Sequence, residues 1–346
     1  MIEQERGTEK KDVVSKPSIA IAGAGILGLW QAYTHARAGY RVRLVEQSSE
    51  PFVRSSSRWA AAMIAPECEA EGAPALVCDL GRESIALWRS AYPGTVVNGT
   101  LVVAPARDAA DLLRFARMTE RHEAVTAQAI AALEPELSGR FDRGLFFPGE
   151  AHVAASQALT HLLDKVRALG TITEFGHPFE RRGEDIVIDC RGLGAQSDLP
   201  SLRGVRGERV LVQSRDVTLS RPVRLLHPRQ PIYVVPQGDG RYVVGASVIE
   251  REDDDPMTLK SALDLLGSAY ALHPAFGEAS VIDMGAGVRP SFADNVPRII
   301  IEDNGRIIRV NGAYRHGFLL APVLAEAVGR FLSDGRRESP LFADVG

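Results

Sequence analysis

Three glycines at a fixed spacing, with an acidic residue further along the chain, are the first residues in this sequence that suggest chemistry. Gly23, Gly25 and Gly28 follow a short apolar run at residues 19–22 and open a segment of helical character. At such a turn the first glycine permits a tight bend, the second lets the backbone approach a pyrophosphate, and the third lets the helix pack closely on the strand. Glu46 ends a second apolar run, in the position of an acid that accepts a hydrogen bond from a ribose hydroxyl.

This pattern predicts a dinucleotide-binding βαβ unit, and it fits NAD and FAD equally well. The free N–H groups at the helix N-terminus suit the anion that the glycines admit. The alternative interpretation is a glycine-rich turn in a flavodoxin-like sheet.

Strand and helix patterns alternate along the rest of the chain. Strand patterns lie at 99–105, 186–190, 210–213, 232–236, 242–246 and 307–310, and a hairpin turn is expected at 237–240. Helical patterns lie at 72–92, 108–122, 156–170 with Ser156 as N-cap, 258–272, and from about 318 to 333. Segments of α/β type at the start, middle and end of the chain therefore bracket two antiparallel insertions.

The predicted fold class is α/β, with a Rossmann-like dinucleotide-binding domain and an inserted α+β domain built on an antiparallel sheet. We assign residues 18–92, 150–205 and 285–346 to the first domain and residues 93–149 and 206–284 to the second. Residues 1–17 are expected to form a disordered tail.

Composition argues against several other classes of protein. The chain has 346 residues, 45% of them apolar, a formal net charge of −4 and no basic stripe, so nucleic-acid binding is not expected. Residues 1–17 lack the apolar core of a signal peptide, and residues 18–30 are too short and glycine-rich for a membrane span. Cys68, Cys78 and Cys190 lack CxxC spacing and the eight histidines lack metal-binding spacing, which predicts reduced thiols, a cytoplasmic setting and no metal. The acidic run at 250–255 is expected to be solvated.

Seven separated stretches, taken in order, resemble one family, the amino-acid-oxidising flavoproteins related to D-amino acid oxidase. They are GAGILGLW at 23–30, AAAMIAPECEAEG at 60–72, GRFDRGLFFPGEAHV at 139–153, DCRGLGA at 189–195, YVVPQGDGRYVVGAS at 233–247, GVRPSFADNVPRI at 287–299 and NGAYRHGFLLAP at 311–322. Within the family the resemblance is closest to the glycine oxidases of thiamine thiazole synthesis. It implies FAD rather than NAD, a glutathione reductase-like FAD-binding domain, an inserted substrate domain and a homo-oligomer.

The resemblance implies a role at the substrate for four residues. Arg289 matches the family's carboxylate clamp, and a guanidinium suits this role because its planar charged fork makes two parallel hydrogen bonds to a carboxylate. Tyr233 is expected to point its hydroxyl at the same carboxylate, whereas Tyr242 across the hairpin is expected to be structural. Arg315 is expected near the substrate and the flavin, and Met63 near the reacting face of the flavin. The alternatives are solvated loop arginines, a half-buried sheet tyrosine and a tightly packed turn.

The same resemblance implies contacts to FAD along several segments of the chain. The last helix is expected to aim its N-terminus at the pyrimidine edge of the flavin, where negative charge develops on reduction. The expected cofactor-binding residues are Gly23, Gly25, Ile26, Gly28, Glu46, Arg58, Ala61, Ala62, Met63, Gly192, Gly287, Arg289, Tyr314, Arg315, Gly317, Phe318 and Leu319. His316 stands where relatives usually carry a different polar residue and is given no role.

The resemblance therefore implies an FAD-dependent oxidase of glycine or another small amino acid. Hydride transfer from the neutral amine to flavin N5 would give an imine, which hydrolyses to glyoxylate and ammonia or passes to thiazole assembly. Reoxidation by O₂ would give H₂O₂. The alternatives are a D-amino acid or sarcosine-type oxidase or dehydrogenase with O₂ or another electron acceptor, and a flavin-bearing subunit of a larger complex.

Overall fold

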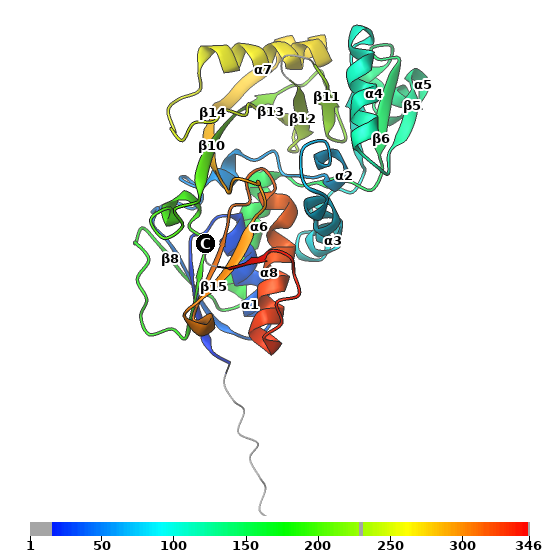
Figure 1. Cartoon of the computed structure of the whole chain (residues 1–346). Coiled ribbons are helices and arrows are strands. Elements are labelled where there is room, and N and C mark those ends of the chain that lie inside the picture. Colours follow the sequence, from blue (N-terminus) through cyan, green and yellow to red (C-terminus); the bar gives the residue numbers. More distant parts are fainter. Residues whose placement is uncertain (1–15, 228–230, 345–346) are drawn as a thin grey trace, which may run out of the picture.

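The computed structural model describes residues 16–227 and 231–344, which form two large sheets with helices packed around them (Figure 1). One sheet and its helices α1, α6 and α8 form the lower part of the molecule in this view, and the other sheet with α7 forms the upper part. The long strands β10 and β14 belong to the upper sheet and reach toward the lower part. Most of the predicted tail at 1–17 lies outside the described residues.

The lower sheet carries the glycine-rich turn between its central strand β1 and helix α1. Its strand order is β17-β15-β16-β9-β1-β2-β8, parallel except for the antiparallel pair of β15 and β16. The strands are β1 (Ser18–Ala22), β2 (Arg41–Glu46), β8 (Ile172–Phe175), β9 (Ile186–Asp189), β15 (Arg298–Glu302), β16 (Ile307–Asn311) and β17 (Phe342–Ala343). Helix α1 (Ile26–Arg37) packs between α6 (Ala155–Ala168) and α8 (Gly317–Asp334), and α3 (Ala75–Ala91) packs on α8. Because helices cover this parallel sheet, most residues of its central strands β1, β2 and β9 are buried.

The upper sheet has eight strands in the order β14-β10-β13-β12-β11-β4-β6-β5, antiparallel except for the parallel pair of β11 and β4. The strands are β4 (Thr100–Val103), β5 (Glu123–Thr126), β6 (Arg143–Phe147), β10 (Arg203–Gln213), β11 (Val223–Leu225), β12 (Ile232–Pro236), β13 (Arg241–Gly245) and β14 (Ser280–Ser291). Helix α7 (Leu259–Leu272) packs on β10, β12 and β13, whereas α4 (Ala109–Met118) and α5 (Ala127–Leu133) pack on β6.

Short elements connect the two parts of the molecule. Strand β3 (Met63–Ile64) pairs with β7 (Ala151–His152), and it lies between the 3₁₀ helix η1 (Ser56–Trp59) and helix α2 (Pro66–Glu69). The remaining 3₁₀ helices are η2 (Ala106–Asp108), η3 (Pro135–Leu137), η4 (Gly192–Ala195), η5 (Pro274–Glu278) and η6 (Asp303–Gly305). Within the described residues, no helix is both long and apolar enough to cross a membrane.

These observations confirm the predicted fold class. The division into domains stays a prediction, and its boundaries at 205 and 285 fall inside β10 and β14, which run on without a break. The predicted N-cap of the helix at 156–170 is wrong, because α6 begins at Ala155 after Ala154. Its first N–H groups do not need a serine cap, since the Gln237 side chain accepts a hydrogen bond from the Ala155 N–H at 3.0 Å. Thr258, in contrast, caps α7 by accepting from the Ser261 N–H.

Two buried histidines make the stability of this fold depend on pH. Burial lowers the pKa of His35, which is 0% exposed, from 6.5 to about 4, and burial together with Arg221 lowers the pKa of His152 to about 4. The unfolded chain binds a proton at each histidine below pH 6.5 and the folded chain does not. The free energy of unfolding should therefore fall as the pH drops from 6.5 toward 4, by about 2 kcal/mol per histidine between pH 7.5 and pH 5.

Thermal unfolding at pH 7.5 and pH 5 measures this loss. His35→Gln should flatten the pH dependence, and the same change at the exposed His177 should not. Burial raises the pKa of Glu150 to about 7, which acts in the opposite direction because the folded chain holds that proton longer. Glu150→Gln should therefore make the loss on acidification steeper. An unchanged pH dependence in His35→Gln would contradict a neutral buried imidazole.

Candidate functional site

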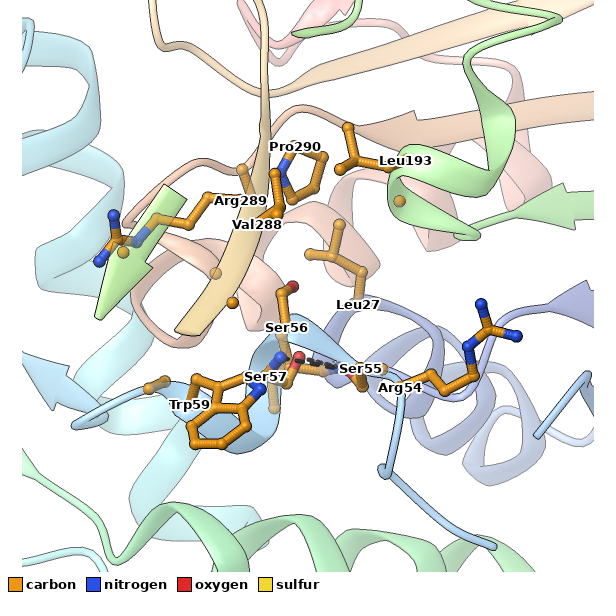
Figure 2. Close-up of a pocket in the computed structure, with 18 of the residues that line it drawn as sticks. Leu27, Arg54, Ser55, Ser56, Ser57, Trp59, Leu193, Val288, Arg289 and Pro290 are labelled. Carbon is orange, nitrogen blue, oxygen red and sulfur yellow. Dashed lines mark hydrogen bonds between the residues drawn. The ribbon is translucent and has the colours of Figure 1, made fainter. Parts of the chain in front are cut away.

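A cavity of about 850 Å³ is lined by segments from both parts of the molecule. One end is formed by the glycine-rich turn after β1 and by the end of β2, and the other end by β10, β12, β14 and the N-terminus of α8. Figure 2 shows Arg289 and Trp59 on one side of the cavity and Arg54 on the other. The same cavity is therefore lined by residues of the predicted nucleotide site and by residues of the predicted substrate site.

The glycines of the turn are required by close backbone contacts. A Cβ atom on Gly23, whose φ is +94°, would lie 2.6 Å from the carbonyl oxygen of Cys190, and one on Gly28 would lie 1.8 Å from the carbonyl oxygen of Gly23. A Cβ atom on Gly25 would lie 3.0 Å from the Ser55 hydroxyl. The backbone is thus bare where a pyrophosphate would approach the N-terminus of α1, which supports the predicted role of each glycine.

Glu46 lies at the same end of the cavity, with its carboxylate held against the turn. Its Oε2 accepts a hydrogen bond from the Ala24 N–H at 2.9 Å, and its Oε1 accepts from the Ser48 N–H at 3.0 Å. Each carboxylate oxygen has further acceptor sites. The acid at the end of β2 is therefore in place to accept from a ribose hydroxyl while it fixes the turn.

Serines at the start of η1, Ser55 as its N-cap and Ser57 within it, complete this end. Ser57 accepts a hydrogen bond from the Ile26 N–H at 3.1 Å, and Ser55 accepts from the Ser57 N–H at 3.2 Å (Figure 2). Ser57 belongs to the run 57–63 that the family resemblance places against the flavin, whereas Ser55 was not predicted to be near the cofactor. Their position beside the turn is a tertiary contact between α1 and η1 that sequence spacing does not reveal.

At the other end of the cavity, two glycines on neighbouring strands lie beneath the side chains of Arg289 and Tyr233. The Arg289 guanidinium lies across β10, so that a Cβ atom on Gly207 would be 1.8 Å from Arg289 Nη2. The Tyr233 ring lies across β13, so that a Cβ atom on Gly245 would be 2.7 Å from its Cε2 and 2.9 Å from its hydroxyl oxygen. Gly245 of β13 and Gly207 of β10 thus both leave room for a larger side chain that lies over the strand. Both predicted carboxylate-binding groups therefore line one cavity wall.

Arg289 has weak internal partners. It donates to the Ser247 carbonyl oxygen at 3.3 and 3.4 Å and to the Arg206 carbonyl oxygen at 3.4 Å. Burial lowers its pKa from the ordinary value, but an arginine side chain stays charged in a protein. A half-buried guanidinium with long hydrogen bonds to neutral acceptors can be stabilised by binding a carboxylate.

The sequence analysis missed Glu69, an acidic residue at the end of α2 that lines the cavity. Its Oε1 lies 3.7 Å from Arg315 Nη2, and its Oε2 lies 3.4 Å from His316 Nδ1. Burial alone would raise the pKa of Glu69, but the positive charge of Arg315, followed by those of Arg224 and Arg289, lowers it below the ordinary value. The only sequence signal was its place in the stretch 60–72, which also holds two other glutamates.

The charge states of Arg315 and His316 depend on this carboxylate and on burial. The Glu69 carboxylate raises the pKa of Arg315 further above its ordinary value. Burial lowers the pKa of His316, which is 3% exposed and precedes the first residue of α8. His316 is therefore neutral near neutral pH, and the charges at this end are those of Glu69 and the arginines.

Most of the predicted site residues come together around the cavity. Those that line it are Gly23, Gly25, Ile26, Glu46, Ala61, Ala62, Met63, Gly192, Tyr233, Gly287, Arg289, Tyr314, Arg315, Gly317 and Phe318. The arrangement fits an elongated dinucleotide, because bare backbone and anion-binding groups lie at one end and small residues border the region between the ends. The role of each residue toward the cofactor or substrate stays a prediction.

Three predicted cofactor-binding residues do not line the cavity. Gly28 lies under the turn, where it permits the close approach of α1. The Arg58 guanidinium lies 4.7 Å from the Trp59 ring and 3.9 Å from Asp283. The Leu319 side chain packs against Gly81 of α3. A Cβ atom on Gly81 would lie 2.8 Å from the Leu319 Cδ1 atom. Helical periodicity explains Leu319, because it places consecutive residues of α8 on different faces.

Two further expectations can be compared with the structure. Tyr242 is structural, since its hydroxyl donates to the Val217 carbonyl oxygen at 2.8 Å and accepts from the Leu219 N–H at 3.1 Å. The acidic run at 250–255 is exposed to solvent as expected, except that Asp253 is half-buried. Glu252 accepts from the Gly204 N–H at 2.7 Å, and Asp253 accepts from Arg206 at 2.8 Å, because these acids cover the start of β10. Among the described residues, no group of three or more His, Cys, Asp or Glu side chains could hold a metal ion.

Comparisons with known proteins agree with this architecture. The family model for FAD dependent oxidoreductases, DAO, matches residues 18–330. A Rhizobium etli protein assigned as the thiamine biosynthesis oxidoreductase ThiO is 49% identical over 91% of this chain and 96% of its own length. A glycine oxidase of Geobacillus kaustophilus is 26% identical over 88% of this chain and 90% of its own length.

The fold is also similar to that of a solved protein. The crystal structure of glycine oxidase from Bacillus cereus superposes with a TM-score of 0.80, covering 96% of this chain and 100% of that chain at 22% identity. The predicted enzyme class and the predicted cofactor, FAD rather than NAD, are confirmed by the family match. This chain belongs to the DAO family of FAD dependent oxidoreductases.

Proposed function

We propose that this enzyme oxidises glycine or a similarly small amino acid to an imine, which hydrolyses to glyoxylate and ammonia, and that O₂ is reduced to H₂O₂. The observation that carries the proposal is the Arg289 guanidinium, held over Gly207 beside Tyr233 in the cavity wall. The 49% identity to a relative assigned to thiamine biosynthesis supports a role in supplying the thiazole precursor of thiamine. The likeness to a glycine oxidase supports glycine as the substrate.

The groups of this chain would bind and orient the substrate. Arg289 binds the carboxylate through two N–H groups, and the Tyr233 hydroxyl donates a further hydrogen bond to it. This fixes both the position and the tilt of the amino acid, so that the Cα–H bond has one direction in the cavity. Bound FAD would supply the two-electron chemistry by accepting a hydride. The N-terminus of α8, beginning at Gly317 in the cavity wall, would stabilise negative charge at that end.

Several partner assignments belong to the same proposal. All three cysteines are free and buried, which supports the predicted reducing, cytoplasmic setting. We also propose that the imine or glyoxylate passes to the thiazole synthesis machinery. Assembly into a homo-oligomer stays a prediction.

Anaerobic reduction of the purified yellow holoenzyme tests the substrate assignment. Glycine should bleach the flavin absorbance faster than sarcosine or D-alanine, and aerobic turnover should yield one H₂O₂ per glyoxylate. Faster bleaching by sarcosine or D-alanine would favour the related oxidase or dehydrogenase. Bleaching without peroxide in air would indicate another electron acceptor. Failure of every amino acid to bleach the flavin, with a chain that elutes as a single species, would favour a subunit of a larger complex.

A further inference from the structure

The charged groups at the substrate end of the cavity are paired unequally. Glu69 forms an ion pair with Arg315 at 3.7 Å, and its Oε2 atom lies 3.4 Å from His316 Nδ1. Arg289 has hydrogen bonds only to carbonyl oxygens, and among the described residues it forms no ion pair within 4.0 Å. Five arginines line the cavity. Arg191, Arg209 and Arg315 are each paired with a carboxylate, whereas Arg289 is not, and Arg54 lies on the opposite side of the cavity (Figure 2).

Other charges near Glu69 do not change this balance. The charge of Arg224 helps to lower the pKa of Glu69, but Arg224 does not line the cavity. Its guanidinium donates hydrogen bonds to Glu71 at 3.2 Å and to the Cys68 carbonyl oxygen at 3.1 Å. His316 is buried, and burial lowers its pKa, so it adds no charge near neutral pH. Glu69 itself is ionised there because its pKa is lowered. The charges that face the cavity from Arg289, Arg315 and Glu69 thus leave one positive charge unmatched.

We infer that Glu69 is the specificity-determining residue that restricts this site to ligands carrying one anionic group. This inference rests on the proposed function, since it concerns the substrate end of the same cavity. A small amino acid with a neutral amine brings a single carboxylate, which matches the unpaired charge of Arg289. A second anionic group on the ligand would need Arg315, but Glu69 occupies that guanidinium and repels the incoming anion.

The glutamate achieves this by like-charge exclusion rather than by size. Its carboxylate lies between the Arg315 guanidinium at 3.7 Å and the His316 Nδ1 atom at 3.4 Å, and of these two groups Arg315 carries the charge. Glu69 is the ion-pair partner of Arg315 among the described residues, so removal of its charge leaves Arg315 without one. The site would then present two guanidiniums and accept a dianionic ligand.

Ligand binding to the FAD-loaded enzyme tests the inference without turnover. Acetate and malonate are unreactive probes that carry one and two carboxylates, and their dissociation constants follow from the shift they cause in the flavin absorbance. In Glu69→Gln the affinity for malonate relative to acetate should rise at least about tenfold, the effect of one added charge-assisted hydrogen bond. The matched control is Glu71→Gln, two residues further on, which pairs with Arg224 and Arg114 outside the cavity lining and should leave the ratio unchanged.

A double variant shows whether Arg315 is the group released. Glu69→Gln combined with Arg315→Gln should lose the gain for malonate. The same preference should appear in catalysis, as a higher kcat/KM for iminodiacetate relative to glycine in Glu69→Gln. Glu69→Ala serves as the second variant if Glu69→Gln does not retain FAD, and it should show the same change.

The outcomes separate this inference from the proposed function. The role of Glu69 would be overturned if, in both Glu69 variants, the affinity for malonate relative to acetate stayed within twofold of the wild-type value. This holds whether or not glycine is a substrate. A rise in that ratio together with a wild-type enzyme that glycine does not reduce would uphold the role of Glu69 and overturn the proposed substrate. A gain that persists in the double variant would also contradict the mechanism, because Arg315 could not be its source.

Discussion

Arg289→Ala should lower kcat/KM for glycine by about a thousandfold and leave FAD bound. The wild-type guanidinium is a half-buried charge whose hydrogen bonds of 3.3–3.4 Å go to carbonyl oxygens, so a substrate carboxylate that covers it would be its first close ionic partner. Truncation of one member of a buried, hydrogen-bonded charge pair costs 2 to more than 5 kcal/mol, so about thirtyfold to several thousandfold is expected. Most of the loss should appear in KM, since the binding of the ground state depends on the same contact.

Two further variants separate charge from geometry. Arg289→Lys keeps a positive charge but lacks the planar fork, so it should recover only part of kcat/KM. Gly207→Ala leaves Arg289 in the sequence, but its Cβ atom would lie 1.8–2.2 Å from the guanidinium and displace it. Steady-state kinetics with glycine, together with the flavin absorbance, measures all three. Wild-type kcat/KM in Arg289→Ala would show that another group holds the carboxylate.

Gly28→Ala should abolish tight FAD binding and lower the free energy of unfolding by about 3 kcal/mol. The new Cβ atom would lie 1.8 Å from the carbonyl oxygen of Gly23 and 3.0 Å from its carbonyl carbon, and neither of these backbone atoms can rotate away as a side chain can. Helix α1 would have to move off β1, which costs at least the 1–3 kcal/mol typical of overpacking. The bare turn that receives the pyrophosphate would move with it.

Flavin fluorescence during titration of the apoprotein, and denaturant unfolding, measure both effects. The matched control is Gly267→Ala in α7, where a Cβ atom meets nothing within 4 Å and alanine is the better helix former. That variant should bind FAD normally and gain up to about 1 kcal/mol in stability. Normal FAD affinity in Gly28→Ala would show that the turn tolerates a wider separation of α1 from β1.

Local patterns predicted the first βαβ unit because all of its signals lie on consecutive elements. The glycines, the helix and Glu46 follow one another within residues 19–46, and the structure forms β1, α1 and β2 there. The hairpin of β12 and β13 was predicted for the same reason, since its turn residues separate two apolar runs. Arg289 and Tyr233 could be named from the family resemblance, but no spacing in the sequence placed them on one wall.

Strand β14 was not predicted, although it spans twelve residues. Gly285, Gly287 and Pro290 within it indicate a break in regular structure when the sequence is considered alone. In the structure the Trp59 ring covers both glycines, and a Cβ atom would lie 2.3 Å from it at Gly285 and 2.7 Å from it at Gly287. The missing side chains are therefore replaced by a tryptophan more than two hundred residues away in the chain.

By itself, then, the sequence determined the dinucleotide turn, the fold class and the family, because these depend on short-range spacing and on ordered motifs. Tertiary structure alone decided which side chains face the cavity. It placed Arg289 over the bare Gly207, turned Leu319 toward α3 and away from the cavity, and brought Glu69 against Arg315. The physical reason is that close approach between distant strands and helices depends on the absence of a Cβ atom or on a compensating charge, and neither is visible until the chain is folded.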